Sequence, residues 1–205
     1  MRALILLSFL MLLNNSFGLN IVIAGGTGTL GKMVASKLTG DKVTILCRNA
    51  FLAATPNKVT EAFGWVGESF LERNPHVKLR DWDGGDLLDI VGQDWVGWQE
   101  DTLTKADVVV NMCGGYTNQR NMATERIVRE SLRVNPNAFQ IIVAPVVEDL
   151  KILTPGLVTM KTKRLQECED LVMKNCLLSK CLRLEAYNLE GSCNQILDAI
   201  QTSKR

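Results

Sequence analysis

The chain has 205 residues, of which 46% are apolar and 22% charged, a composition typical of one globular domain. Twenty-three basic and 22 acidic residues leave a formal net charge of +1. This balance offers no electrostatic footprint for nucleic acid or an anionic membrane surface, so we expect no nucleic-acid partner.

Residues 1–18 have the pattern of a secretory signal peptide. An apolar run covers residues 3–13, and the small residues Ser16 and Gly18 stand three and one positions before a cleavage site. The run is short for a transmembrane helix, although a membrane-held anchor is the alternative. We therefore expect entry into the secretory pathway. A signal followed by a transit peptide starting at Phe17, as in algae with complex plastids, makes a plastid the alternative destination.

A strand, a tight turn and a helix are predicted over residues 20–38. The apolar stretch at 20–24 leads into glycines spaced Gly-x-x-Gly-x-x-Gly, and an amphipathic helix follows over 29–38. The first glycine lets the chain turn, the second lets a pyrophosphate approach the backbone, and the third lets the helix pack on the strand. A Gly-rich turn without a ligand is the alternative. The predicted dinucleotide-binding residues of this turn are Gly25, Thr27, Gly28, Thr29, Leu30 and Gly31.

Strands and helices alternate along the rest of the chain. Strands are predicted at 20–24, 43–47, 77–81, 108–112, 139–143 and 181–185, and helices at 29–38, 94–104, 121–134, 159–175 and 192–202. Residues 50–74 are too long for an ordinary connection and should hold a helix or a functional loop. The alternation predicts right-handed crossovers and a parallel sheet covered on both faces, a doubly wound Rossmann-type α/β fold in a single domain.

Two further motifs accompany the glycine turn. Residues 42–49 have the pattern of a second strand and its cofactor-facing end, and Asn111-Met112-Cys113-Gly114 follows the fourth strand. Together these motifs resemble the short-chain dehydrogenase/reductase superfamily, above all its extended and atypical branches of nucleotide-sugar epimerase-like and NmrA-like proteins. The family's Thr-Gly-Gly-Thr-Gly-x-x-Gly has Ala24 here in place of its first threonine. The resemblance implies an NAD(P)-binding Rossmann domain over residues 19–205, with a truncated C-terminal region whose substrate lobe is absent or supplied by a partner.

The end of the second strand bears on the choice of cofactor. NAD-binding relatives place an acidic residue there for the ribose 2′-hydroxyl, whereas this strand ends in Cys47-Arg48-Asn49. Arg48 offers charge-assisted hydrogen bonds to a 2′-phosphate, so we expect NADP rather than NAD; an exposed arginine without a ligand is the alternative. The resemblance implies further cofactor contacts at Asp83 (or Asp81, with loop capping as the alternative role), Asn111, Cys113, Gly114 and Lys163.

The family's catalytic residues are not found in this sequence. Relatives use Tyr-x-x-x-Lys on the helix after the fifth strand, with a serine before it. If Lys163 is the family lysine, Thr159 stands at the tyrosine position; if Lys161 is, Leu157 does. Tyr116 follows the fourth-strand turn, but nothing fixes it near a nicotinamide. The catalytic residues therefore remain unknown.

The cysteines, the single histidine and the tryptophans are further candidate site residues. Cys47 and Cys113 stand at strand ends, where buried thiols are common. One disulfide within the later group is an alternative that the sequence allows; this group is Cys168, Cys176, Cys181 and Cys193. No Cys-x-x-Cys motif occurs and His76 is the single histidine, so no metal site is expected. Trp82, Trp95 and Trp98 are expected to form local core, with a substrate platform as the alternative.

Two functions follow from these observations. The first is an NADP-dependent reductase or epimerase-like enzyme of the atypical branch. The second is a non-enzymatic, cofactor-bound scaffold, assembly factor or redox sensor with a protein partner, which the missing tyrosine favours. The glycines and Arg48 argue only for the nicotinamide dinucleotide, and a Rossmann shell without a ligand is a third possibility. The substrate cannot be read from the sequence.

Overall fold

The computed structural model describes residues 18–59, 64–84, 96–114, 118–153 and 155–203. Residues 1–17 of the predicted signal peptide lie outside these ranges, as do Trp95 and Tyr116. Within them, no helix is long and apolar enough to cross a membrane.

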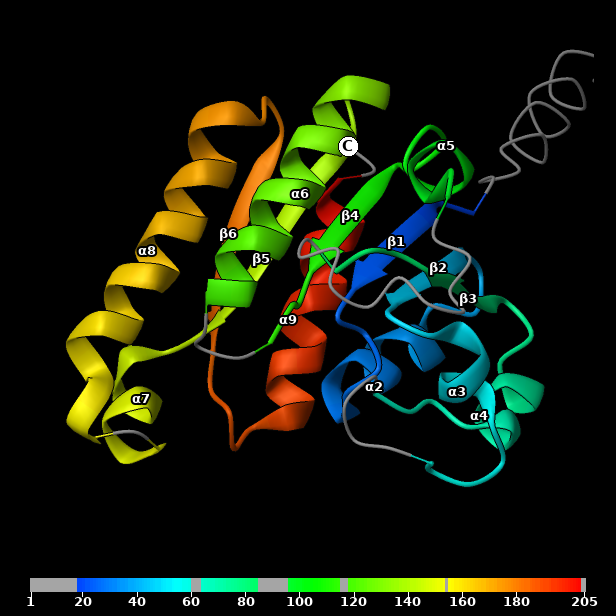
Figure 1. Ribbon diagram of the computed structural model, residues 1–205, viewed down its shortest axis with the longest axis horizontal. Coiled ribbons are helices and arrows are strands. Elements are labelled where there is room, and N and C mark those ends of the chain that lie inside the picture. The colour runs from blue at the N-terminus through cyan, green and yellow to red at the C-terminus, as the bar shows by residue number, and fades with distance from the viewer. Residues whose placement is uncertain (1–17, 60–63, 85–95, 115–117, 154, 204–205) are drawn as a thin grey trace, which may run out of the picture.

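Six strands form one parallel sheet in the order β3-β2-β1-β4-β5-β6 (Figure 1). The strands are β1 (Asn20–Ala24), β2 (Lys42–Cys47), β3 (Val77–Asp81), β4 (Val108–Asn111), β5 (Phe139–Pro145) and β6 (Ser179–Leu184). This order is that of a doubly wound sheet whose strand order reverses between β1 and β4. The predicted Rossmann-type fold is confirmed, and β5 continues two residues beyond its predicted end.

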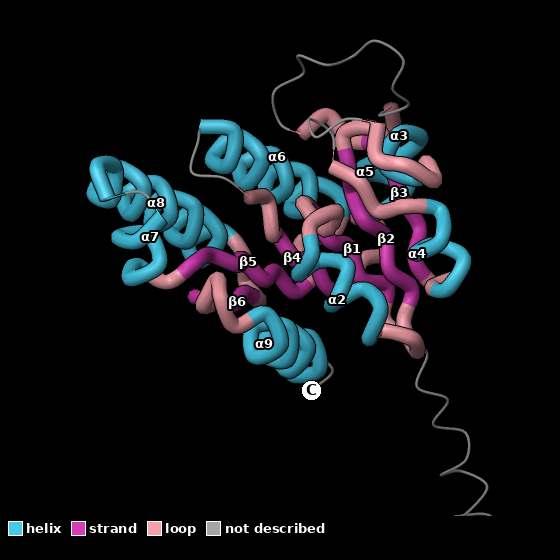
Figure 2. Tube along the Cα trace, turned by 90° about the horizontal axis from the view of Figure 1, so that it is seen from below, coloured by secondary structure: helices cyan, strands magenta, loops and turns pink. Residues whose placement is uncertain are grey.

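Helices cover both faces of the sheet (Figure 2). Those on one face are α2 (Thr29–Lys37), α4 (Glu68–Arg73) and α9 (Leu189–Thr202), and those on the other are α5 (Trp98–Thr102), α6 (Asn118–Val134) and α8 (Val158–Asn175). The remaining ones are α3 (Ala50–Ala54), α7 (Val147–Leu153) and the 3-10 turn η1 (Pro155–Leu157). The long segment at 50–74 thus holds two short helices, and α7 was not predicted.

The strands are apolar throughout because both faces of the sheet are buried. Along β1, Ile21 and Ile23 pack with α2 and α9, whereas Val22 and Ala24 pack with α5 and α6. The second cluster also contains Trp98, which is fully buried, and Trp82, whose ring lies 5.5 Å from it in an edge-on arrangement. Both tryptophans are therefore core residues, as expected, although Trp82 also reaches the cavity described below.

Candidate functional site

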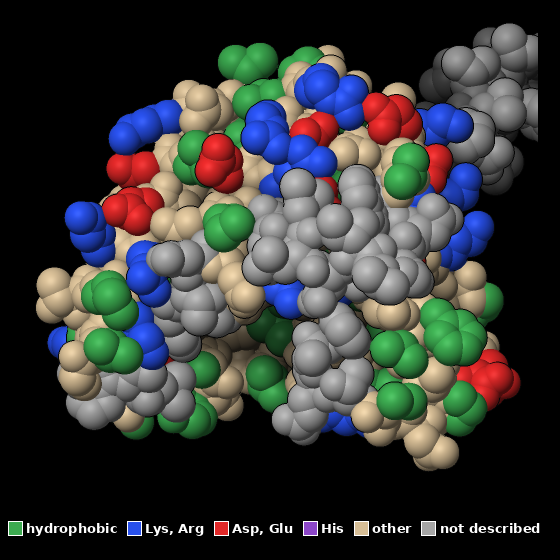
Figure 3. Space-filling model, viewed as in Figure 1, with side chains coloured by type: hydrophobic (Ala, Val, Ile, Leu, Met, Phe, Trp, Pro, Cys, Tyr) green, Lys and Arg blue, Asp and Glu red, His purple; other side chains and the backbone are tan. Residues whose placement is uncertain are grey.

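A cavity of about 820 Å³ opens at the carboxyl ends of the strands, over the point where the strand order reverses. Figure 3 shows this face hollowed below its centre, with hydrophobic side chains at the bottom. Loops that follow β1, β2, β4 and β6 contribute to its wall, together with the end of β5. The predicted cofactor-binding residues that line it are Gly25, Thr27, Gly28, Thr29, Leu30, Gly31, Arg48, Cys113 and Gly114.

The three glycines of the motif have different physical roles. Gly25 has a φ of +76°, and a Cβ there would lie 2.8 Å from the backbone nitrogen of Cys113. A Cβ on Gly31 would lie 2.5 Å from the Gly26 carbonyl oxygen, so only glycine lets α2 pack this closely. A Cβ on Gly28 would meet nothing within 4 Å. Gly28 therefore leaves space in the cavity, whereas Gly25 and Gly31 are required by the fold.

The first turn of α2 is available to an anion. Gly28 is the N-cap residue, no described side chain caps the helix, and its first turn carries no acidic residue. The first N–H groups of a helix lack intrahelical acceptors and stand at the positive end of its dipole. Thr29, Leu30 and Gly31 place these groups in the cavity wall, which is the arrangement that binds phosphate.

Arg48 lies directly after β2 and lines the cavity against Gly84. A Cβ on Gly84 would come within 3.1 Å of Arg48 Nε, so the glycine leaves room for the guanidinium. The neighbouring polar groups cap the N-terminus of α3. Asn49 Oδ1 accepts a hydrogen bond from the Leu52 amide at 2.8 Å, and the Asp81 carboxylate accepts one from the Ala50 amide. Asp81 thus caps a loop, the alternative role considered for it.

Three predicted cofactor residues do not line the cavity: Asp83, Asn111 and Lys163. Asp83 is buried and accepts a hydrogen bond from Arg126 Nε at 2.9 Å. Asn111 shapes the turn after β4, because its Oδ1 accepts from the Cys113 amide at 3.1 Å. The Lys163 side chain is 78% exposed and lies 4.0 Å from Glu167. Their geometry therefore lends no support to direct cofactor contact.

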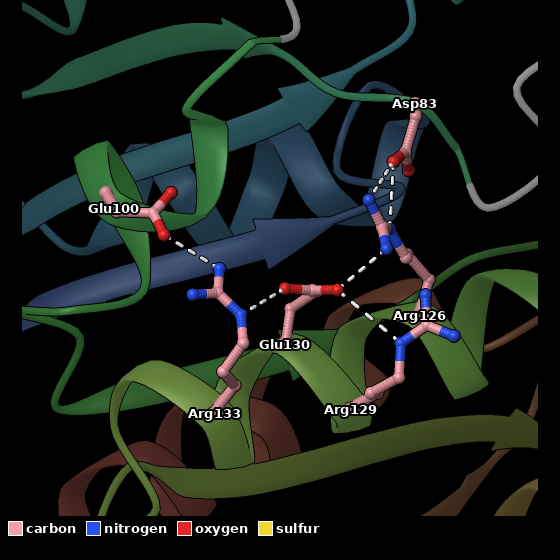
Figure 4. Close-up of polar contacts among 6 residues, drawn as sticks. All are labelled: Asp83, Glu100, Arg126, Arg129, Glu130 and Arg133. Carbon is pink, nitrogen blue, oxygen red and sulfur yellow. Dashed lines mark hydrogen bonds and ion pairs between the residues drawn. The ribbon is translucent and has the colours of Figure 1, made fainter.

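Asp83 belongs to an ion-pair network that joins the loop after β3 to α6 and α5 (Figure 4). Glu130, only 8% exposed, accepts from Arg126 Nη1 at 2.7 Å and from Arg133 Nε at 2.8 Å. Arg133 continues to Glu100 on α5 at 2.7 Å. Since Gly84 follows Asp83, the network also holds the backbone beside Arg48. Glu130 pairs with Arg126 and Arg133 at helical spacing, but sequence patterns gave no sign of the contacts to Asp83 and Glu100.

Glu130 should make stability depend on pH. Burial alone would raise the pKa of Glu130, but the hydrogen bond from Arg133 and the nearby guanidinium charges hold the pKa below its usual 4.5. Because the folded pKa is lowered, the stabilisation is complete above the unfolded pKa and is lost as pH falls through the folded one. We expect Glu130→Gln to reduce the unfolding free energy by about 2 kcal/mol at pH 7, and by less below pH 4.

Urea unfolding across this pH range measures the effect. Glu125→Gln, at an exposed position on the same helix, is the matched control and should change stability little. Equal stability of wild type and Glu130→Gln at pH 7 would contradict the stabilising role of the network.

The thiols predicted to lie near the cofactor are buried and protonated. Burial raises the pKa of Cys47 to about 12. It also raises the pKa of Cys113 to about 12, although the charges of Arg120 and Arg48 act in the opposite direction. All six cysteines are free in the structure, so no disulfide forms among the later four. Neither cavity thiol has the character of a nucleophile, which must be a thiolate.

The positions at which the resemblance implies catalytic hydroxyls offer none to the cavity. Thr159 and Leu157 are exposed and do not line the cavity. The end of β5 contributes Val143, Ala144 and Pro145 to the wall, none of which carries a hydroxyl group. The described residues therefore offer no Ser–Tyr pair at the β5 side of the cavity.

Several lining residues were missed by sequence reasoning, of which Arg120 and Glu185 carry charge. Arg120 is one of several arginines on α6, and its spacing does not set it apart. Gly64 is a further missed residue: it lies against Thr27 and has a φ of +77°. The adjoining Trp65 ring is covered by Lys32 Nζ, 5.1 Å from the ring centroid, which holds this loop beside α2.

No protein-family model and no curated protein matches this chain in sequence. Solved structures match its fold. An alcohol dehydrogenase from Comamonas testosteroni that is specific for bulky-bulky ketones matches with a TM-score of 0.56 and 12% identity, over 91% of this chain and 84% of that chain. WbmF from Bordetella bronchiseptica, solved in complex with NAD+ and UDP, matches with a TM-score of 0.51 and 13% identity, over 82% and 50%. A mutant of NmrA matches with a TM-score of 0.51 and 15% identity, over 80% and 44%.

At these identities the likeness concerns the fold alone. It confirms the fold implied by the resemblance to short-chain dehydrogenases, epimerases and NmrA-like proteins. The chain spans about half the length of WbmF and somewhat less of NmrA.

Proposed function

We propose that this chain binds a nicotinamide dinucleotide in the cavity, with the pyrophosphate at the start of α2. The observation that carries the proposal is the open space at Gly28, beside an uncapped helix start at the reversal of strand order. WbmF, which shares the fold, was solved with NAD+, and this supports the choice of ligand.

Co-purification and titration test the proposal. Native mass spectrometry of the protein as isolated would reveal a bound nucleotide by its mass. Titration with NADPH, monitored by the enhancement of the cofactor's fluorescence, would give an affinity whether or not a nucleotide co-purifies. Absence of binding at millimolar NADPH, with the protein folded by circular dichroism, would reject the proposal.

We further propose that NADP is preferred over NAD. Arg48 follows β2 and lines the cavity, where its guanidinium suits a 2′-phosphate, and no acidic residue lines this part of the described wall. We expect Arg48→Ala to weaken NADPH binding about 10- to 100-fold and to leave NADH binding nearly unchanged. Calorimetric titration with each nucleotide makes the comparison.

Lys42→Ala is the matched control, because Lys42 is exposed and begins the strand that Arg48 follows, at the opposite edge of the sheet. Its affinity for both nucleotides should match that of the wild type. An equal loss of NADPH and NADH affinity in Arg48→Ala would show that Arg48 does not read the 2′-phosphate.

A second candidate function is a cofactor-bound scaffold or redox sensor without turnover. The observation that favours it is the wall at the end of β5, which lacks the hydroxyl group that orients a carbonyl in the related enzymes. A bound nicotinamide supplies hydride when reduced, but carbonyl reduction also needs a proton donor at the alkoxide. NADPH consumption with aldehydes, ketones, quinones and nucleotide sugars separates the two functions, since the sensor binds NADPH and consumes none.

A further inference from the structure

Arg120 stands out among the arginines by its burial. It lies in the first turn of α6, is 4% exposed and lines the cavity. Its Nη1 donates to the Cys113 carbonyl at 2.7 Å, and its Nη2 donates to the Val143 carbonyl at 2.5 Å. Its Nε is buried and has no hydrogen-bond partner among the described residues. The guanidinium therefore bridges the turn after β4 and strand β5, and its Nε–H is left without an acceptor in the described part of the chain.

The charge of Arg120 is also unbalanced. Arg126 pairs with Asp83 and Glu130, and Arg183 pairs with Glu169, although their side chains are 20% and 34% exposed. No ion pair joins Arg120 to a carboxylate within the described part of the chain. An arginine cannot lose its proton, and a buried cation is costly unless an anion accompanies it. Arg120 is more deeply buried than Arg126 and Arg183, yet it lacks the carboxylate partner that both of them have among the described residues.

We propose that Arg120 binds the carboxylate of a second ligand in the β4–β5 half of the cavity. The missing counter-charge is then supplied by the ligand. A carboxylate fits because its two oxygens match the planar guanidinium. The protein would thus act on, or respond to, a small organic acid bound beside the dinucleotide.

The position of Arg120 separates it from the predicted phosphate contacts. The proposed binding site of the cofactor's pyrophosphate is the start of α2, and that of a 2′-phosphate is Arg48 after β2. Arg120 bonds to the carbonyls that follow β4 and lie within β5, on the other side of the strand reversal. Only the assignment of the first half to a dinucleotide rests on the proposed function.

The charge on the ligand is limited by Glu185. This exposed carboxylate follows β6 and lines the same cavity, so a second carboxylate of the ligand placed beside it would be repelled. A monocarboxylate that carries a hydroxyl or amide donor suits both charged residues. The apolar wall of Val143, Ala144 and Pro145 accommodates its carbon skeleton.

Calorimetric titration with oxamate tests the proposal, with acetamide as a neutral analogue that lacks the carboxylate. The titrations use NADPH-saturated protein at constant ionic strength. We expect oxamate to bind wild type, acetamide not to bind, and Arg120→Met to weaken oxamate at least about tenfold. Arg129→Met, at an exposed arginine of the same helix, should bind oxamate as the wild type does.

Other results would overturn the proposal. Equal binding of acetamide and oxamate would show that the negative charge is not recognised. Binding of inorganic phosphate without binding of oxamate would show that the site does not take a carboxylate. If Arg120→Met lost NADPH affinity as strongly as oxamate affinity, Arg120 would serve the dinucleotide instead.

The failure of the proposed function is distinguishable from failure of this one. If wild type does not bind NADPH, oxamate is titrated into the protein without the cofactor. Loss of oxamate binding in Arg120→Met would then still support the anion site. Because Arg120 also bridges two strands, Arg120→Lys serves as a second variant if Arg120→Met does not fold. It keeps the charge and should retain part of the oxamate affinity, whereas complete retention by a folded Arg120→Met would reject the site.

Discussion

Replacing Gly28 with valine should abolish NADPH binding and leave the fold intact. The added Cβ meets no protein atom within 4 Å, so the chain accepts it. Gly28 has a φ of −75° and a ψ of 172°, a conformation open to any residue, so the backbone is not strained. The branched side chain would instead fill the space in front of the α2 amides. We expect affinity to fall by about a hundredfold or more in a fluorescence titration.

Two other glycine variants make this result specific. Gly40→Val also adds its Cβ in open space, but Gly40 lies outside the cavity lining, so NADPH binding should persist. In Gly31→Val the Cβ would lie 2.5 Å from the Gly26 carbonyl oxygen, so both thermal stability and binding should fall. NADPH binding by Gly28→Val at wild-type affinity would place the pyrophosphate elsewhere.

The fold was predictable because its signals are local. Strand–helix alternation, with apolar stretches such as 20–24 and 139–143, defines all six strands within about two residues of their observed bounds. The glycine turn was equally readable, because close packing at Gly31 and the turn at Gly25 admit one residue type only. A short element such as α7 was missed, since seven residues after a proline carry little periodicity.

The site was predictable at the glycine turn and shortly after β2 and β4. Arg48 and Cys113 could be placed in the cavity because the strand ends determine where they lie. Lys163 could not, because α8 continues for 18 residues and a small change of register turns a side chain from the cavity to solvent.

Long-range pairing explains the other differences between prediction and structure. Asp83 turns away from the cavity because Arg126, 43 residues later in the chain, binds its carboxylate. Arg120 enters the cavity because two strand-end carbonyls accept its donors. Neither contact leaves a periodic trace in the sequence, so both residues had to be found in the structure.

Removal of the Trp98 side chain should have the largest effect on stability. Trp98 is fully buried on the face of the sheet covered by α5 and α6, where it packs edge-on against Trp82. Trp98→Ala removes the whole ring and leaves a cavity that the parallel sheet cannot close. We expect the unfolding free energy to fall by about 3–5 kcal/mol, measured by urea unfolding monitored with circular dichroism.

The aromatic ring, rather than the indole N–H, should account for this loss. Trp98 Nε1 is buried and has no hydrogen-bond partner among the described residues. Trp98→Phe removes that unsatisfied donor and keeps an aromatic ring against Trp82, and it should cost much less than the alanine variant. A phenylalanine variant as unstable as Trp98→Ala would mean that the N–H does have a partner. Because Trp82 also lines the cavity, Trp98→Ala should weaken NADPH binding as well, whereas Trp98→Phe should preserve it.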